Sequence, residues 1–182
     1  RRCLVSLAGD VAVAVANQGK DDRRGWAELL ATALDRLAAR EDIDLIALPD
    51  AGRLDGADVI RLQARALAQC AVQGDRVAIL DALPAADAAG VLAQAAELAT
   101  SAGNIVSGAL YWPWVATAPG QFLPPCGAVC GVIARTDAAT GVFKAPANAL
   151  LEGVIDLAQS VDDAAQTPLN EAGINAIRVL PG

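Results

Sequence analysis

Two aspartates stand where this sequence could perform chemistry. Asp50 follows the apolar run 43–49, and Asp81 lies near the end of a second run, 76–83. Both would therefore lie at the carboxyl ends of strands, the edge at which open α/β sheets bind ligands. Two carboxylates there could hold a magnesium ion and a phosphorylated substrate. The alternative is that each aspartate caps a turn or the helix after its strand.

The cysteines offer a second possible chemistry. Cys126 follows two prolines and opens a predicted helix, whose dipole would favour a thiolate. However, the chain contains no histidine to act as a base, and its cysteines include no CxxC pair. We therefore expect no metal site and no hydrolase triad. The four cysteines are predicted to be small buried residues in a reducing compartment; they are Cys3, Cys70, Cys126 and Cys130.

Ligand-binding signatures are missing elsewhere. The sequence has neither a GxxxxGK[ST] loop nor a GxGxxG motif, so we expect no nucleotide cofactor. A net charge of −7 and an isoelectric point near 4.5 argue against nucleic acid as a partner. The aromatic segment 111–114 is either a packed cluster or a platform for a nucleobase or sugar.

Alternating strands and helices would position these residues. The alternating residues 11–16 predict a strand, and helical periodicity predicts helices at 24–40, 55–71 and 85–101, the second ended by Gly74. Strands are predicted at 43–49, 76–83 and 104–111, the last running into Pro113 at a strand end or sheet edge. This order indicates βαβ units and an α/β fold with a mixed, largely parallel sheet flanked by helices.

The second half of the chain is less regular. We predict a loop at 117–125, a helix at 126–135, a turn at 136–141 and a strand at 150–157. A polar loop at 160–166, a turn at 169–173 and a final strand at 174–180 would follow. No repeat or low-complexity linker is visible, so we expect one domain over 1–182.

Charge is distributed very unevenly. Between Val77 and Ala134 the only charged residues are Asp81, Asp87 and Glu97. Much of this stretch must be buried, and the alanine-rich helix 85–101 would pack either inside the domain or against another subunit. No apolar run is long enough for a membrane span, which predicts a soluble protein without direct membrane insertion. Because the chain starts with arginine and ends at Gly182, we expect a fragment of a longer protein.

Several ordered motifs in the second half carry a family resemblance. They are the Tyr-Trp-Pro-Trp segment 111–114, the Pro-Pro-Cys-Gly helix start and Arg-Thr-Asp end of 124–137, Gly-Val-Phe-Lys-Ala-Pro-Ala-Asn at 141–148, and Leu-Asn-Glu-Ala-Gly-Ile-Asn-Ala-Ile-Arg at 169–178. Together they resemble the tail sheath proteins of contractile phages and related injection particles. Family members often have serine and alanine where Cys126 and Cys130 stand, and a glycine-rich motif often found before the first helix is not clear in 7–22.

The resemblance implies a structural subunit rather than an enzyme. Such subunits form stacked hexameric rings around an inner tube protein and contract to drive the tube through a target envelope. Their partners would be further sheath subunits, the inner tube, and baseplate and tail terminator proteins. Assembly would take place in the bacterial cytoplasm, as part of a phage tail or injection particle. Family sequences normally continue into a C-terminal arm, which we expect to be absent here.

The motif residues are expected to be structural, with no catalytic, cofactor or metal role. In particular, we predict that Arg135, Asp137, Lys144 and Asn148 are mainly internal and fix the turn after the 126–135 helix, with an interface role as the alternative. The complete set implied by the resemblance is Trp112, Pro113, Trp114, Arg135, Thr136, Asp137, Lys144, Pro146, Asn148, Asn170, Asn175 and Arg178. A magnesium enzyme built on Asp50 and Asp81 is the competing function.

Overall fold

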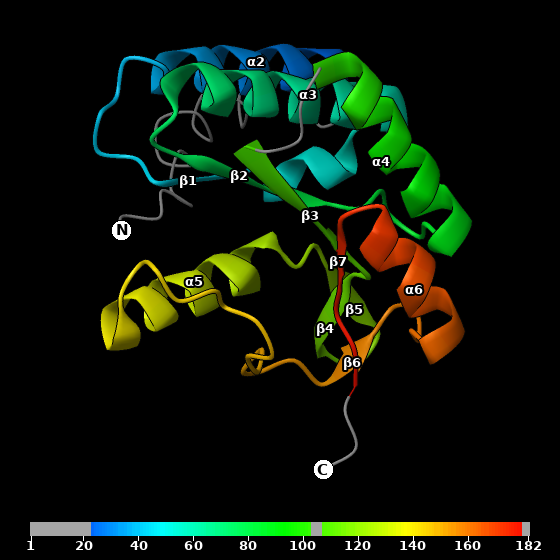
Figure 1. Cartoon of the computed structure of the whole chain (residues 1–182). Helices are drawn as coiled ribbons and strands as arrows, with labels where there is room; N and C mark the ends of the chain where they lie inside the picture. The colour runs from blue at the N-terminus through cyan, green and yellow to red at the C-terminus, as the bar shows by residue number, and fades with distance from the viewer. Residues whose placement is uncertain (1–22, 103–106, 180–182) are drawn as a thin grey trace.

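A parallel sheet with helices on its two faces forms the centre of the molecule (Figure 1). The computed structural model describes residues 23–102 and 107–179. All pairings within the central sheet are parallel, in the order β1-β2-β3-β7. Its strands are β1 (Leu45–Ala47), β2 (Val77–Asp81), β3 (Gly108–Trp112) and β7 (Ile174–Ala176). The expected α/β class is confirmed.

Three helices cover one face of this sheet, and they are α2 (Arg23–Leu37), α3 (Gly56–Gln73) and α4 (Ala88–Ala102). Strands β1, β2 and β3 are added in sequence order. Because crossovers between parallel strands keep one hand, α3 and α4 fall on the same face. A short 3₁₀ helix, η1 (Pro49–Arg53), lies between β1 and α3.

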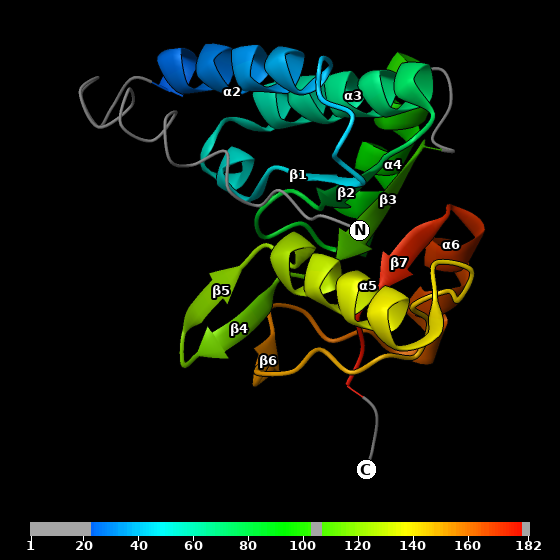
Figure 2. The same cartoon turned by 90° about the vertical axis from the view of Figure 1, so that its left-hand side faces the viewer.

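The other face is covered by a unit that the chain builds after β3 (Figure 2). It contains an antiparallel sheet in the order β5-β4-β6 and the helix α5, which packs against β1 and β2. Helix α6 then leads back to β7 at the edge of the central sheet. The bounds are β4 (Val115–Ala118), β5 (Gln121–Leu123), α5 (Cys126–Thr140), β6 (Asp156–Leu157) and α6 (Asp163–Glu171).

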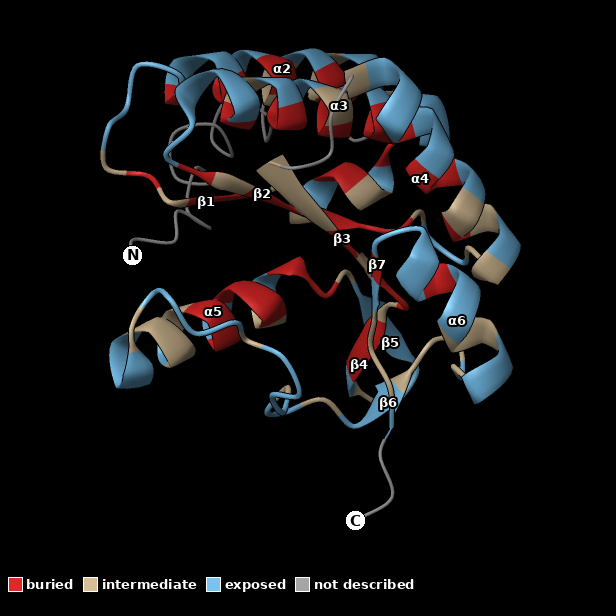
Figure 3. Ribbon diagram, in the orientation of Figure 1, coloured by how far each residue is buried: buried red, intermediate tan, exposed pale blue. Residues whose placement is uncertain are grey.

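The core consists of two apolar layers separated by the sheet (Figure 3). Successive side chains of a strand point to opposite faces. Ile46 and Leu80 therefore join the large cluster under α2, α3 and α4. Leu45 and Ile79 join a smaller cluster with Cys126, Cys130 and their neighbours on α5. Aliphatic and small side chains fill both layers, as the low aromatic content predicts.

Two glycines are required by local geometry. Gly74 ends α3 with a φ of +70°, as the C-cap prediction expects, and its N–H bonds to the carbonyl of Cys70 at 2.9 Å. Gly108 begins β3 directly below α3. A Cβ atom at this position would overlap the side chain of Leu67 and meet the Ala78 carbonyl oxygen at 3.1 Å. Sheet and helix therefore approach closely here because residue 108 has no side chain.

Several predicted elements in the second half are wrong. The predicted loop 117–125 contains the β4–β5 hairpin, because Pro119-Gly120 forms a tight turn between pairing strands. The predicted loop and turn in 160–173 are replaced by α6, which Asp162 caps by accepting a hydrogen bond from the N–H of Ala165 at 2.8 Å. Helix α5 continues through the predicted turn as far as Thr140.

Other boundaries differ less. The strand expected at 150–157 is reduced to Asp156–Leu157. Helix α4 starts at Ala88, directly after Asp87, whose Oδ1 accepts a hydrogen bond from the N–H of Gly90 at 2.8 Å. Pro113 follows the last residue of β3, so it stands at a strand end, and β3 itself lies between two other strands. The predicted strand 11–16 and Cys3 lie outside the described residues.

Candidate functional site

The two aspartates proposed as magnesium ligands have different environments. Asp50 is exposed in η1, where its carboxylate lies 3.6 Å from the guanidinium of Arg53. Asp81 ends β2 and is only 7% exposed. Within residues 23–102 and 107–179, no group of three side chains is arranged to hold a metal ion. The capping alternative therefore describes Asp81, and Asp50 forms an ion pair at the surface.

Asp81 caps helix α5 from a neighbouring strand. Its Oδ1 accepts a hydrogen bond from the backbone N–H of Cys126, the first residue of α5, at 2.8 Å. Helix starts have N–H groups without partners in the helix and a positive dipole end, so a carboxylate there is favourable. Burial nevertheless raises the pKa of Asp81 from 3.8 to about 6, against the opposing effect of its hydrogen bonds with Cys126. The carboxylate thus holds α5 in place, although burial of its charge is unfavourable.

The cysteines behave as buried apolar residues. Cys70, Cys126 and Cys130 are all buried, and none of the three is in a disulfide. Burial raises the pKa of the Cys70 thiol to about 11, and burial beside the Asp81 carboxylate raises the pKa of Cys126 further. A thiolate at Cys126 is therefore disfavoured, despite its position at a helix start, and this counts against the nucleophile alternative.

Two glutamine side chains form hydrogen bonds with the main chain at the end of β2. Gln63 and Gln94 both donate to the carbonyl of Asp81, at 2.7 and 3.1 Å. Gln94 also donates to the Gln63 side chain at 2.8 Å and accepts from the N–H of Leu83 at 2.9 Å. Both glutamines are buried. This network joins α3 and α4 to the end of β2, and sequence periodicity alone gave no signal for it.

The aromatic segment at the end of β3 is packed inside the molecule. Trp112 is 3% exposed, and its indole N–H donates to the carbonyl of Ala86 at 2.7 Å. The indole of Trp114 donates to the carbonyl of Ala82 at 2.8 Å and closely approaches Gly52. Pro113 between them is also buried. The nucleobase platform is therefore wrong, because these rings and their N–H groups are already occupied.

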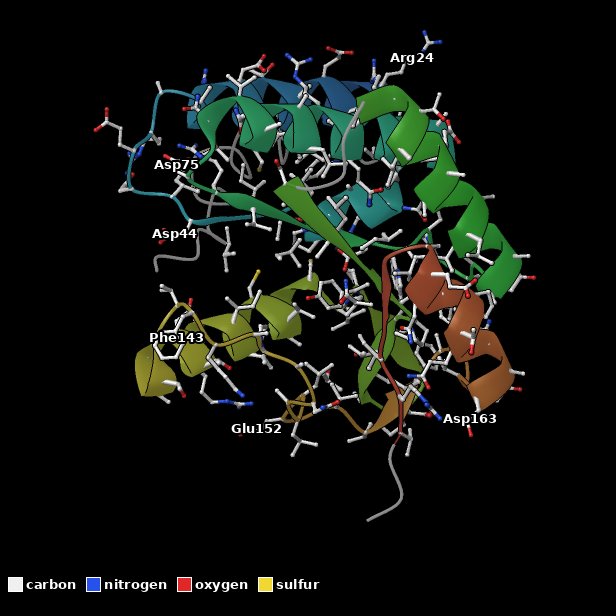
Figure 4. All side chains as sticks on the ribbon, in the orientation of Figure 1. Arg24, Asp44, Asp75, Phe143, Glu152 and Asp163 are labelled. Carbon is white, nitrogen blue, oxygen red and sulfur yellow. The ribbon has the colours of Figure 1, made fainter. Side chains whose placement is uncertain are left out.

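The residues at the end of α5 hold the segment that returns beneath it. Arg135 donates to Oε1 of Glu152 at 2.6 Å and to the carbonyl of Leu150 at 2.9 Å. Thr136 and Asp137 are half-buried on the last turns of the helix. Arg135 is largely exposed, so its bridge to 150–152 fixes that segment from the surface. Figure 4 shows Glu152 on this segment and Phe143 at the far end of α5.

The prediction of internal side chains is wrong for three of its four residues. Arg135, Lys144 and Asn148 are exposed in the isolated chain, and Pro146 is half-buried. Asn148 takes a φ of +55°, a left-handed conformation that asparagine tolerates better than most residues. Helix α5 extends beyond the expected turn, so the 142–149 segment passes over the surface instead of filling a corner.

The last motif joins α6 to β7. Arg178 donates to Oδ1 of Asp163 at 2.6 Å and to the side chain of Gln166. Asn175 donates to the carbonyl of Leu110 at 3.3 Å across the β3–β7 pair. Asn170 is exposed near the end of α6, and its carbonyl accepts from the N–H of Gly173 in the turn that follows. These residues thus fix the return of the chain to the central sheet.

An open groove of about 830 Å³ lies between α5, the 145–157 segment and the β7 side of the molecule. Most of the lining side chains are aliphatic, among them Val129, Val132 and Leu150. Four amide side chains also line the groove, and they are Asn148, Gln166, Asn170 and Asn175. Two charged residues line it, Asp156 and Arg178, and Arg178 is already bonded to α6. Ionisable groups therefore do not converge in the groove as they do in a catalytic pocket.

The fold and these contacts define a structural α/β domain, in which polar side chains at strand and helix ends hold elements together. Residues 27–182 match the model of the phage tail sheath protein central domain. The chain therefore belongs to the phage tail sheath family, which is structural and not enzymatic. No described helix is long and apolar enough to cross a bilayer.

Two solved structures are similar over nearly the whole chain. One, in the baseplate of the anti-feeding prophage, is 25% identical with a TM-score of 0.59 and is matched over 98% of this chain and 48% of its own. The other, in the contracted helical sheath of the anti-feeding prophage, is 27% identical with a TM-score of 0.58. The match covers 90% of this chain and 42% of that protein. This chain thus spans less than half the length of either. A comparison with curated protein sequences finds no significant match.

Proposed function

We propose that this domain belongs to a subunit that polymerises as stacked hexameric rings around an inner tube and contracts to drive that tube through a target envelope. The match of 27–182 to the sheath central domain carries the proposal. The similarity to a helical sheath supports it. We further propose that 1–182 forms one core domain and that its motif residues serve folding and assembly.

The partners in this proposal are other sheath subunits, an inner tube protein, and baseplate and tail terminator proteins. Assembly takes place in the bacterial cytoplasm, and the product is a phage tail or an injection particle. Within the described residues, β1 and β7 are the outer strands of the central sheet. Edge strands present unpaired main-chain groups, to which terminal arms of neighbouring subunits can add strands.

Contraction in this proposal is a rearrangement of rigid units. The core under α2, α3 and α4 and the core beneath α5 are joined through a single sheet. Ion pairs and capping bonds at both ends of α5 add further links. A domain built in this way keeps its shape while its contacts with neighbours change, as in rigid-body transitions of other assemblies.

Electron microscopy tests the proposal directly. The full-length protein, expressed alone or with its tube partner, is expected to form long cylinders in negative stain. Asp50→Asn provides a matched control, because the residue is exposed and the magnesium interpretation gives it a catalytic role. Cylinders formed equally by the wild type and by this variant support the sheath function. Magnesium-dependent turnover that Asp50→Asn abolishes would contradict it.

A further inference from the structure

Large apolar side chains are exposed in four places on the described residues. Leu150, Ile155 and Val179 line the groove, and we call them the groove surface. Phe122 and Leu123 lie on β5, and we call them the hairpin surface. Val142 and Phe143 follow α5, and Val72 stands alone on α3. Clustered exposed apolar groups of this kind mark interaction sites more often than single ones do.

The hairpin surface and the groove lie at opposite edges of one small sheet. In the order β5-β4-β6, the hairpin surface occupies the outer strand β5. Strand β6 at the other edge contributes Asp156 and Leu157 to the lining of the groove. Figure 2 shows the β4–β5 hairpin on one side of the lower unit and α6 on the other. One copy therefore presents the two surfaces in different directions.

A helical assembly requires two different surfaces on each subunit that fit each other. Contacts that repeat along a helix or around a ring are heterologous, so one surface of a subunit meets a different surface of the next. A surface that paired only with itself would close a dimer and stop growth. The relative in the helical sheath shows that proteins of this fold form helical assemblies. In an assembly of this kind, the partner of the groove is a different surface of a second copy of this chain.

The chemistry of the hairpin also fits an aliphatic groove. Residues 115–125 contain no charged side chain, so burial of the hairpin removes no ion from water. All three residues of β5 are exposed, and β4 is its partner on one side. By contrast, Phe143 is followed directly by Lys144, whose ammonium would have to be desolvated or kept at the rim. The hairpin is therefore the better match.

We propose that the β4–β5 hairpin of one subunit, through Phe122 and Leu123, packs into the groove formed by Leu150, Ile155 and Val179 of the next subunit. The inference rests on the proposed sheath function and names one contact within it. Truncation of either surface, as in Leu123→Ser or Leu150→Ser, should raise the critical concentration for assembly by roughly tenfold.

Crosslinking between two differently tagged chains tests the contact. One full-length chain carries Leu123→Cys and the other Leu150→Cys, both in a Cys3→Ser background, while Cys70, Cys126 and Cys130 stay buried. A short bismaleimide should join the two tags after the chains are mixed and assembled. Val72→Cys, which is 84% exposed on α3, is the matched negative control, and Phe143→Cys tests the competing partner.

The outcomes separate this inference from the proposed function. Cylinders with a 123–150 crosslink support both. Cylinders without this crosslink, or with Leu150→Cys joined to Phe143→Cys instead, overturn the hairpin contact and leave the sheath function standing. A 123–150 crosslink without cylinders supports the contact and counts against the sheath. Neither cylinders nor crosslink counts against both.

Discussion

Asp81→Asn should make the protein more stable at neutral pH, although it removes a helix-capping charge. The carboxylate of Asp81 is buried, and within the described part of the chain no arginine or lysine pairs with it. Burial raises its pKa from 3.8 to about 6. Asparagine has nearly the same shape, and its Oδ1 can still accept from the N–H of Cys126. The substitution therefore keeps the cap and removes the buried charge.

The sign and size follow from proton linkage. Below about pH 4 the carboxyl is protonated in both the folded and the unfolded chain. As pH rises from 4 to 6, the unfolded chain ionises first, so the free energy of unfolding falls. A pKa rise from 3.8 to about 6 lowers the free energy of unfolding by about 3 kcal/mol. The full decrease is reached above about pH 6. Asp81→Asn should recover much of this loss at pH 7 and little at pH 4.

Urea unfolding followed by tryptophan fluorescence measures the effect at a series of pH values. The quantity of interest is the difference in unfolding free energy between variant and wild type, because other carboxylates titrate equally in both. Asp50→Asn is the control, since Asp50 is exposed and paired only with Arg53 at 3.6 Å. A difference that does not change between pH 4 and 7, or a variant less stable than wild type at pH 7, would refute the reasoning.

Three further substitutions or modifications test the packing. Gly108→Ala should lower the free energy of unfolding by about 1–3 kcal/mol in urea titrations, because its Cβ overlaps Leu67; an unchanged midpoint would disprove the close approach. Arg76→Met should cost about 2–3 kcal/mol by thermal unfolding, since the buried guanidinium donates to the carbonyls of Leu37 and Arg40 at 2.9 and 2.6 Å; a neutral effect would contradict this. A thiol reagent should modify Cys126 only as fast as the protein unfolds, and rapid labelling of the native chain would show that the thiol is accessible.

The first half of the fold could be predicted because its signals are local. Helical periodicity places α2 and α3, and Gly74 ends α3 at the residue that the C-cap rule indicates. The runs before Asp50 and after Arg76 give β1 and β2. Each element there has an apolar face wide enough to be recognised without its neighbours, so local pattern and tertiary structure agree.

The second half was harder because its elements depend on distant partners. Strand β6 is two residues long and exists because Ile155 donates to the carbonyl of Ala116 in β4 and Ala158 donates to that of Trp114, the residue before β4. Helix α6 carries Pro168 in its interior, which sequence rules count against a helix, yet Leu169 buries completely in the core. The Pro119-Gly120 pair was a usable turn signal for the hairpin.

The edge of the sheet where α/β proteins usually bind ligands is filled by the chain's own groups. At the end of β2, the carbonyl of Asp81 is taken by Gln63 and Gln94, and its carboxylate by α5. The next carbonyl, of Ala82, accepts from Trp114. A helix start that could have held a phosphate is instead capped by a buried carboxylate, which would repel any anion. The position that suggested an enzyme from the sequence is thus the joint that ties both helical layers to one strand.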